Sequence, residues 1–465
     1  MIYSLESFYV KCDGKDSFFE PMHISSLIGH TQELLGIILN SKKPADVLID
    51  TFFRSHKYLG SHDRKFIAET TYGTLRHLRK CELMVASAMA ELNEILFEED
   101  KTLFLVVAYL FLQGSTQEVI PENISSKLKS TQLAEKMAYV LNIFMKPVTI
   151  PTESVVERIG IEHSFPDWMV QKLIEQYGES EAEKICASLN EQAPITLRVN
   201  TLKTTVEQCQ VEFNKQKIET TRTVLSPFGL NLAKRINVFS LPIFRDGWFE
   251  VQDEGSQVLP LLIDPKPNAK LLDVCAGAGG KTLEFAALMK NRGEIFATDI
   301  NSYRLEELRK RTKRAGAQNV RIQEIQAIED LIEQYSDFFD IVFVDAPCSG
   351  LGTIRRNPGM KWMVTEQTVN EVSDKQKSIL SSSALLVKPG GRIVYATCTL
   401  LRQENEDIVK EFTVRYPEFK LVEASGLLNK WNNKLVTTSP FFRLLPHIHG
   451  TDGFFCAVLE KHTVR

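Results

Sequence analysis

Two cysteines in the last third of the chain follow short hydrophobic runs, in positions that suit covalent chemistry. Cys348 closes a DAPC segment that begins at Asp345 after the run 341–344, and Cys398 follows the run 393–396. If both runs are parallel strands, both thiols lie at the carboxyl edge of one sheet, where open α/β sheets bind ligands. A thiol beside a carboxylate favours nucleophilic catalysis. Metal binding is the alternative, but neither cysteine has a CxxC or His partner at zinc spacing.

A glycine-rich turn precedes the two cysteines in the chain. Gly277, Gly279 and Gly280 follow the apolar run 271–274 and stand before a helical pattern. Glycine permits a sharp turn and a close approach to a ligand beside a helix N-terminus. The spacing is neither GxGxxG nor GxxxxGK[ST], which argues against a dinucleotide or ATP site. Asp299 follows roughly 20 residues later, where an acid can bind a ribose diol; a generic turn with a helix-capping Asp is the alternative.

The elements that would position these residues alternate in type from residue 252 onward. Apolar runs at 269–275, 293–300, 338–347 and 390–400 alternate with helical patterns such as SYRLEELRKRTKRAG. This alternation predicts a parallel, doubly wound sheet.

The rest of the chain divides into two further parts. Residues 1–150 are predicted to be helical, because apolar residues recur at helical spacing and Gly and Pro are sparse. The stretch KPVTIPTESV predicts a linker. Residues 156–250 combine helical and short strand patterns, which indicates a small mixed α/β module before a sheet domain at 251–465.

Composition sets broad limits on function. The 465 residues are 43% hydrophobic and 25% charged, as in ordinary globular proteins, which excludes a disordered, collagen-like or disulfide-scaffold protein. The formal net charge of −4 does not indicate nucleic-acid binding, although a local basic patch is sufficient for such binding. No apolar stretch approaches the ~18 residues of a membrane span, and no secretory signal is recognised. Dispersed cysteines predict reduced thiols in a cytoplasmic protein. We expect small buried apolar roles for Cys12, Cys81, Cys186, Cys209 and Cys456.

The sequence resembles the Nop/Sun (Fmu) family of S-adenosylmethionine-dependent RNA cytosine-5 methyltransferases. The blocks that carry the resemblance are LLDVCAGAGGKT, TDINSYRLEEL, VDAPCSGLGTIRRNPGMKW and YATCTLLRQENE, with FPDWMVQKLIEQYGESEAEKI, LRVNTLK, GWFEVQDEGSQ and LLPHIHGTDGFFCAVLEK outside the core. Similarity is continuous over about 160–465. The segment SHDRKFIAETTYGTLRHLRK is similar to the NusB-like RNA-binding domain of the bacterial ribosomal branch. The resemblance implies a Rossmann-like class I methyltransferase sheet, an all-α NusB-like N-terminal domain and a small α/β RNA-binding module between them.

The resemblance also implies roles for the catalytic residues. Carbon 5 of cytosine is too weak a nucleophile to take a methyl group unaided, and a thiolate that adds at carbon 6 makes it enamine-like. By motif, Cys398 is this nucleophile and Cys348 assists loss of the covalent enzyme. Asp345 would contact the base near its N3 edge and lie close to the cofactor.

For S-adenosylmethionine, the resemblance implies contacts from Asp299 to the ribose and from Arg304 as an auxiliary residue. Two positions depart from the family pattern. Ala278 replaces the usual proline, and Gln326 replaces an acid near the adenine, so it keeps hydrogen bonding but loses charge. The loop expected to cradle the methionine part comprises Cys275, Ala276, Gly277, Ala278, Gly279, Gly280 and Lys281.

RNA contacts are expected from two clusters, and no metal site is expected. Cations beside a stacking side chain indicate RNA recognition. The helical run at 309–314 is expected to be a solvated face instead. The residues expected to contact RNA are Arg355, Arg356, Lys361 and Trp362 near the sheet edge, and Arg198, Asn200 and Lys203 in the small module.

Three functions remain open from the sequence. The first is an RNA cytosine-5 methyltransferase, acting as a monomer on small-subunit ribosomal RNA. The second is an RNA-binding or ribosome-assembly protein of the same family with weak or no activity, which Gln326 and Ala278 keep open and Cys348, Cys398 and Asp345 oppose. The third, methylation of DNA or a small molecule, is disfavoured by the RNA-type modules upstream.

Overall fold

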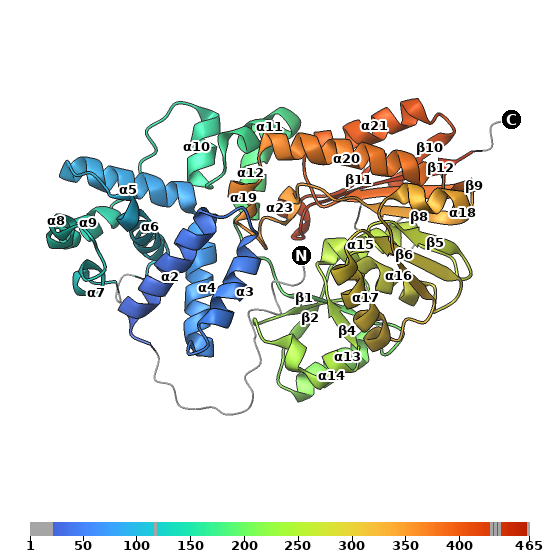
Figure 1. Ribbon diagram of the computed structural model, residues 1–465, viewed down its shortest axis with the longest axis horizontal. Coiled ribbons are helices and arrows are strands. Elements are labelled where there is room, and N and C mark those ends of the chain that lie inside the picture. Colours follow the sequence, from blue (N-terminus) through green and yellow to red (C-terminus); the bar gives the residue numbers. More distant parts are fainter. Residues whose placement is uncertain (1–21, 116–118, 428–430, 432–434, 436–438, 463–465) are drawn as a thin grey trace. The chain divides into compact units, whose positions relative to one another are not determined.

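The computed structural model describes residues 22–115, 119–427, 431, 435 and 439–462 (Figure 1). Cys12 lies outside these residues. The chain forms two compact units, each described by itself below. The first comprises residues up to Glu191 together with Ile354–Met363, and the second comprises Gln192–Thr353 and the chain from Val364 onward. No helix in these described ranges combines the length and apolar character needed to cross a bilayer.

The first unit is helical, as the sequence predicted. Helix α6 lies at its centre, because its residues from Leu103 to Ala108 are all buried and it packs against α2, α4 and α5. The helices are α2 (Ile24–Leu39), α3 (Ala45–Ser55), α4 (Ser61–Arg76), α5 (Leu78–Leu92), α6 (Glu98–Leu112), α7 (Pro121–Ser125), α8 (Thr131–Glu135), α9 (Met137–Phe144), α10 (Val155–Glu162), α11 (Asp167–Tyr177), α12 (Glu179–Leu189) and the inserted α19 (Met360–Met363).

The boundary of the first unit differs from the expected one. The predicted linker is an irregular stretch between α9 and α10. Helix α10 nevertheless packs against α5, so the compact unit continues to Glu191 and does not end near residue 150. The composition of the predicted linker therefore indicates a break in secondary structure, whereas the packing of α10–α12 determines where the first compact unit ends.

A four-stranded antiparallel sheet opens the second unit. Its strand order is β2-β3-β1-β4, and Arg198 on β1 pairs with Glu250 on β4. Phe213 of the covering helix packs against Phe249, with ring centroids 5.4 Å apart. Its elements are β1 (Thr196–Val199), α13 (Val206–Lys215), β2 (Thr220–Arg222), β3 (Gly229–Leu232), η1 (Val238–Ser240), α14 (Pro242–Arg245) and β4 (Phe249–Val251).

The large sheet contains eight strands. Its order is β10-β12-β9-β8-β5-β6-β7, with β11 paired to β12, and the five strands from β9 to β7 are parallel. The sequence predicted four of these five parallel strands, and it predicted neither β7 nor the antiparallel strands β10, β11 and β12. The strands are β5 (Lys270–Asp273), β6 (Glu294–Asp299), β7 (Val320–Glu324), β8 (Phe339–Asp345), β9 (Val387–Thr397), β10 (Phe419–Val422), β11 (Phe442–Leu444) and β12 (Phe454–Lys461).

Helices cover both faces of this sheet, as Figure 1 shows. Successive strand residues face opposite cores: Leu271 packs with Phe285 of α16, whereas Leu272 packs with Leu380 of α20. The helices are α15 (Glu254–Ile263), α16 (Gly280–Leu288), α17 (Ser302–Ala315), η2 (Ile328–Leu331), α18 (Ile332–Tyr335), η3 (Leu351–Thr353), α20 (Glu366–Ala384), η4 (Arg402–Glu404), α21 (Glu406–Arg415), α22 (Ala424–Leu427) and α23 (Pro446–His449).

The strand order reverses between β5 and β8. From β5 the chain proceeds outward through β6 and β7, then returns to place β8 on the other side of β5. Ligands bind open α/β sheets in the crevice beyond the carboxyl ends of the strands at such a reversal. The glycine-rich turn follows β5 and Asp345 ends β8, so the fold places these two predicted features at the reversal.

Candidate active site

The glycine-rich turn after β5 has a backbone that requires glycine. Gly277 and Gly279 have φ angles of +54° and +83°, a region that side-chain-bearing residues disfavour. A Cβ atom on Gly279 would also lie 2.0 Å from Cδ1 of Leu308 on α17. Gly279 therefore lets the start of α16 lie close to α17. Within the turn, the amides of Ala276 and Gly279 donate to the carbonyls of Thr298 and Ala276.

Asp299, at the end of β6, is held by the backbone around it. Its Oδ2 accepts a hydrogen bond from the amide of Gly277 at 2.9 Å, and its Oδ1 accepts one from the amide of Asn301 at 2.8 Å. The side chain is mostly buried, while Arg304 on the first turn of α17 is exposed. The carboxylate is therefore oriented before any ligand arrives, and each oxygen retains capacity for a further donor.

Asp273 lies beneath the turn as a second buried acid. Its Oδ2 accepts a hydrogen bond from the Thr282 hydroxyl at 2.6 Å, while its Oδ1 is buried with no hydrogen-bond partner among the described residues. Burial raises the pKa of Asp273 to about 7, opposed by the Thr282 bond and assisted by the negative charge of Asp345. Burial likewise raises the pKa of the neighbouring Cys275 thiol, which therefore stays protonated at neutral pH.

Lys281 and Asp345 form an ion pair at the reversal point. Nζ of Lys281 lies 2.6 Å from Oδ2 of Asp345. Burial alone would lower the pKa of Lys281, but the charge of Asp345 and its hydrogen bond outweigh burial and raise it. The lysine is therefore a fixed cation, and it directs the Asp345 carboxylate at the end of β8.

The two predicted thiols lie against each other. Sγ of Cys348 is 3.3 Å from Sγ of Cys398, and the backbone N–H of Cys398 donates to Sγ of Cys348 at 3.4 Å. The hydrogen bond to Cys398, together with burial and the nearby charges of Cys398 and Glu404, raises the pKa of the Cys348 thiol. Cys348 therefore keeps its proton and can donate it toward the sulfur of Cys398.

Glu404 connects the loops that carry the thiols. Its fully buried carboxylate accepts hydrogen bonds from the amide of Ser349 at 2.8 Å, the Ser349 hydroxyl at 2.5 Å and the Thr399 hydroxyl at 2.8 Å. Ser349 and Thr399 directly follow the two cysteines. Reasoning from residue types did not assign Glu404 this role of joining the two loops, although Glu404 lies in the QENE segment of the matched block YATCTLLRQENE.

Asn405 reinforces the second of these loops. Its Oδ1 accepts a hydrogen bond from the Thr397 hydroxyl at 2.6 Å, and its Nδ2 donates to the carbonyl of Thr399 at 3.1 Å. Thr397 and Thr399 flank Cys398, so its backbone is fixed on both sides. The arrangement brings two thiols, an oriented carboxylate and a cation together at one sheet edge.

Comparison with known proteins assigns the family. Residues 260–460 match the family described as 16S rRNA methyltransferase RsmB/F, and residues 165–239 match its ferredoxin-like domain. A protein of Synechocystis sp. called probable ribosomal RNA small subunit methyltransferase B is 30% identical over 433 residues, which cover 90% of this chain and 95% of that protein. The chain belongs to the RsmB/F family of 16S rRNA methyltransferases. A Bacillus subtilis protein of the same description is 30% identical over 90% of this chain and 94% of its own length.

Solved structures share the fold of this chain. The crystal structure of PH0851 has 28% sequence identity, a TM-score of 0.73, and covers 96% of this chain and 100% of its own. NSun6 from Pyrococcus horikoshii, determined with SFG, shares the fold at 24% identity, with a TM-score of 0.58 over 64% of this chain and 99% of its own. The expected Rossmann-like methyltransferase fold is confirmed.

Two residues expected to bind RNA in the small module of this RsmB/F protein are buried instead. Arg198 donates to the carbonyl of Gly280 at 2.5 Å and to Glu284 at 3.0 Å, and it also bonds Gln252. Asn200 donates to the carbonyls of Gly247 and Ala315 at 2.8 and 2.9 Å. The prediction of RNA contact is wrong for Arg198 and Asn200, since their polar groups bind the protein itself. Lys203 is exposed.

The cluster at 355–362 is also largely structural. Lys361 is fully buried within the first unit, where Nζ donates to the carbonyls of Arg76 and His163 and to Oδ1 of Asn190 at 2.7, 3.3 and 2.9 Å. Burial and the charge of Arg76 lower its pKa well below the ordinary value. RNA contact by Lys361 was therefore predicted wrongly.

The neighbours of Lys361 share this environment. The side chain of Arg355 is buried, and the indole N–H of the half-buried Trp362 donates to the carbonyl of Leu75 at 2.7 Å. These positions contradict RNA contact by Arg355 and leave Trp362 packed against the helical core. Arg356 is half-buried. A lysine or tryptophan in a glycine- and proline-containing segment resembles a surface feature, and only the fold reveals its distant partners.

Gln326 follows β7, the outer neighbour of β6. Its side chain is exposed, and its backbone N–H donates to Oδ2 of Asp330 at 2.8 Å. The backbone amides of Ala327 and Gln326 lower the pKa of Asp330. Asp330, four residues after Gln326, is therefore engaged in capping its own loop, and a cofactor contact from Gln326 stays a prediction.

Proposed function

We propose that this chain transfers the methyl group of S-adenosylmethionine to carbon 5 of a cytosine in small-subunit ribosomal RNA through a covalent bond between Cys398 and the base. The observation that carries the proposal is the pair of thiols 3.3 Å apart, at the ends of adjacent strands and beside Asp345. Methyl transfer to an oxygen or an exocyclic nitrogen needs no thiol, whereas carbon 5 must first be activated.

The residues around the glycine-rich turn fit S-adenosylmethionine. Asp299 offers a fixed carboxylate for the ribose hydroxyls. The partnerless Oδ1 of Asp273 offers a buried acceptor beneath the turn, and the ammonium group of the cofactor is a suitable donor. When bound, the cofactor supplies an electrophilic sulfonium methyl group. Asp299 and the buried Oδ1 of Asp273, rather than the uncharged side chain of Gln326, would then carry much of the recognition.

The thiols and Asp345 divide the chemistry on the base. The thiolate of Cys398 adds to carbon 6, and the electron pair of the C5–C6 bond shifts toward carbon 5 and N3. As N3 takes up a proton from solvent, the Asp345 carboxylate, held by Lys281, accepts a hydrogen bond at this edge and stabilises the adduct. Carbon 5 takes the methyl group, and S-adenosylhomocysteine leaves. The carbon-5 proton then passes to solvent, its bonding pair re-forms the C5–C6 double bond, and the C6–sulfur bond breaks, which releases Cys398 and restores the aromatic ring.

Cys348 acts in the second half of this sequence. Because its pKa is raised, Cys348 holds a proton 3.3 Å from the sulfur that must leave carbon 6. Protonation of a departing thiolate lowers the barrier to its loss. The geometry therefore supports the nucleophile role for Cys398 and an elimination role for Cys348.

Tritium release tests the position of methylation. The full-length protein is incubated with S-adenosylmethionine and small-subunit ribosomal RNA that carries tritium at carbon 5 of cytosine. Attack at carbon 5 displaces that hydrogen, so we expect one tritium released per methyl group transferred. RNA labelled at carbon 5 of uracil is the matched control and should release none. Methyl transfer without tritium release would place the reaction at another atom, and no transfer at all would favour the RNA-binding alternative.

A further inference from the structure

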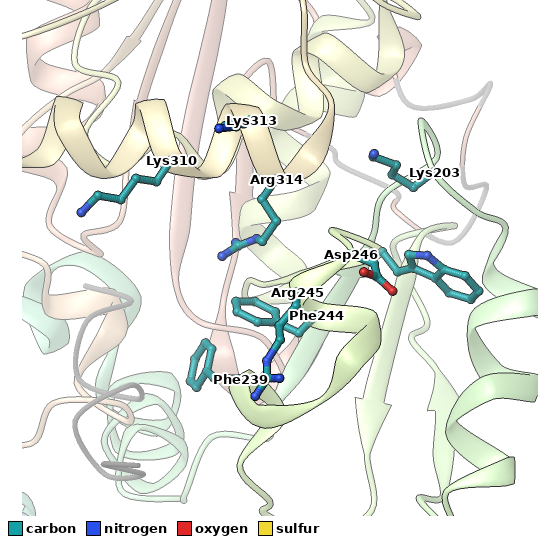
Figure 2. Close-up of a pocket in the computed structure, with 9 residues that line it drawn as sticks. Lys203, Phe239, Phe244, Arg245, Asp246, Lys310, Lys313 and Arg314 are labelled. Atoms are coloured by element: carbon teal, nitrogen blue, oxygen red, sulfur yellow. The ribbon is translucent and has the colours of Figure 1, made fainter. Parts of the chain in front are cut away.

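An open basic cavity lies in the second unit, away from the thiols. It has a volume of about 840 Å³ and is formed between α17 and the η1–α14 segment (Figure 2). The lining residues are Lys203, Phe239, Phe244, Arg245, Asp246, Trp248, Lys310, Lys313 and Arg314. The methyl-transfer chemistry proposed above assigns no role to this cavity.

Positive charge dominates the lining of the cavity. Five of the nine residues are cationic and one, Asp246, is acidic, although the whole chain has a net charge of −4. Arg314 is compensated, because its Nη2 lies 2.7 Å from both oxygens of buried Glu250. Lys310 makes only a 3.7 Å contact with Glu307 and remains 66% exposed. The excess charge therefore resides on the exposed side chains of Lys203, Arg245, Lys310 and Lys313, which suits a polyanionic ligand.

Aromatic side chains form the floor. Phe239 and Phe244 pack edge to face with centroids 5.0 Å apart, and the guanidinium of Arg314 lies 4.0 Å from the Phe244 ring centre. Figure 2 shows Arg314 extending from α17 toward Phe244, with Phe239 and Arg245 on the opposite side from Lys310. Phe239 and Trp248 are only half-buried. Partly exposed rings beside lysines are the combination that binds unpaired nucleotides, by stacking and by phosphate contacts.

We propose that this cavity binds a single-stranded segment of the RNA substrate. The lysines of α17 and Lys203 contact phosphates, and Phe239 or Trp248 stacks on a base. A duplex would present phosphates but no free base face, so the aromatic floor favours a single strand. Arg311, which stands between the two lysines on α17, donates to the carbonyl of Ala278 at 2.8 Å. Helix α17 therefore also packs against the glycine-rich turn, while Lys310 and Lys313 are exposed. The identity of the ligand as RNA rests on the proposed function.

Paired variants of the full-length protein test the site. The probe is a fluorescein-labelled 12-nucleotide oligoadenylate, compared with a 12-base-pair RNA duplex. Lys310→Glu with Lys313→Glu should weaken oligoadenylate binding about ten-fold or more and flatten the salt slope by about 0.7 for each lost phosphate contact. Lys310→Gln with Lys313→Gln should give the same direction with a smaller loss. Lys375→Glu with Lys410→Glu, two exposed lysines on α20 and α21, is the charge-matched control.

A second variant separates stacking from charge. Trp248→Leu should weaken oligoadenylate binding about five-fold and leave the salt slope unchanged. Affinity and slope equal to the control in the lysine variants would overturn the site, and equal loss of duplex and single-strand binding would overturn its single-strand character. Tritium release by the unaltered protein reports the proposed function independently. Absence of that release with loss of oligoadenylate binding in the variants would reject the methylation chemistry alone.

Discussion

The carboxyl edge of the large sheet and the basic segment Ile354–Met363 were both expected to be functional, and the structure treats them differently. At the sheet edge, Cys348 and Cys398 meet at 3.3 Å and Asp345 pairs with Lys281. In the basic segment, Lys361 is buried and saturated by protein acceptors. Residues at strand ends are positioned by a regular topology that the sequence reveals. The exposure of a lysine depends on partners hundreds of residues away along the chain, and the sequence does not reveal these partners.

The largest expected effect comes from removing each of the two thiols in turn, because their proposed roles differ. Cys398→Ala should abolish methylation, by at least about a thousand-fold, and form no covalent RNA adduct. Cys348→Ala should still form the bond and fail to resolve it. Denaturing gels of protein, RNA and S-adenosylmethionine should show a slow-migrating species only for the second variant.

Two outcomes would contradict the roles proposed for the two thiols at the sheet edge. An adduct that accumulates in Cys398→Ala and not in Cys348→Ala would reverse the assignment. Equal thermal destabilisation of both variants, with no adduct in either, would indicate a shared structural role for the thiol pair.

On the other side of the comparison, Lys361→Met should affect stability rather than RNA binding. The substitution removes the Lys361 donor from the carbonyl of Arg76 and from Oδ1 of Asn190, while the carbonyl of His163 keeps its bond from Nδ2 of Asn190. Loss of these buried bonds should cost about 2–4 kcal/mol of unfolding free energy, measured by urea denaturation. Lys375→Met, at an exposed position on α20, should cost little. Weakened RNA affinity with unchanged stability would contradict the structural role.

Glu404→Gln tests whether the bonds between the two loops at the sheet edge hold the thiols in place. The amide cannot accept all the bonds that the carboxylate receives from Ser349 and Thr399, so the two thiols lose their fixed separation. We expect kcat and the rate of adduct formation to fall about 10- to 100-fold, with the KM for RNA little changed. Glu411→Gln, exposed on α21, is the matched control. An equal fall in RNA affinity would indicate general disruption instead.

The smallest expected effect concerns Asp273 and depends on pH. Its folded-state pKa of about 7 is raised above the ordinary 3.8, so the folded protein loses stability from this group as pH rises from about 4 to 7. Asp273→Asn removes that cost while keeping an acceptor for Thr282. Its gain in unfolding free energy over the unaltered protein should grow between pH 5 and pH 8, to about 1–2 kcal/mol, while S-adenosylmethionine affinity falls. A gain that does not vary with pH would contradict the assignment.

The sequence by itself determined which apolar runs form four of the parallel strands and that each thiol follows one of them. Apolar runs alternating with helical patterns fixed which residues follow strand ends, and the carboxyl ends of parallel strands share one edge. Gly279, Asp299, Asp345, Cys348 and Cys398 were found this way, because each depends on local spacing. The matched blocks added the family.

Tertiary structure alone decided which polar residues are buried and by what. Arg198 binds the carbonyl of Gly280, and Lys361 binds that of Arg76, across separations of 82 and 285 residues. Glu404 joins two loops that are 50 residues apart along the chain. In each case the free energy of a buried polar group depends on whether a partner is present. That partner is set by packing, which no local pattern encodes.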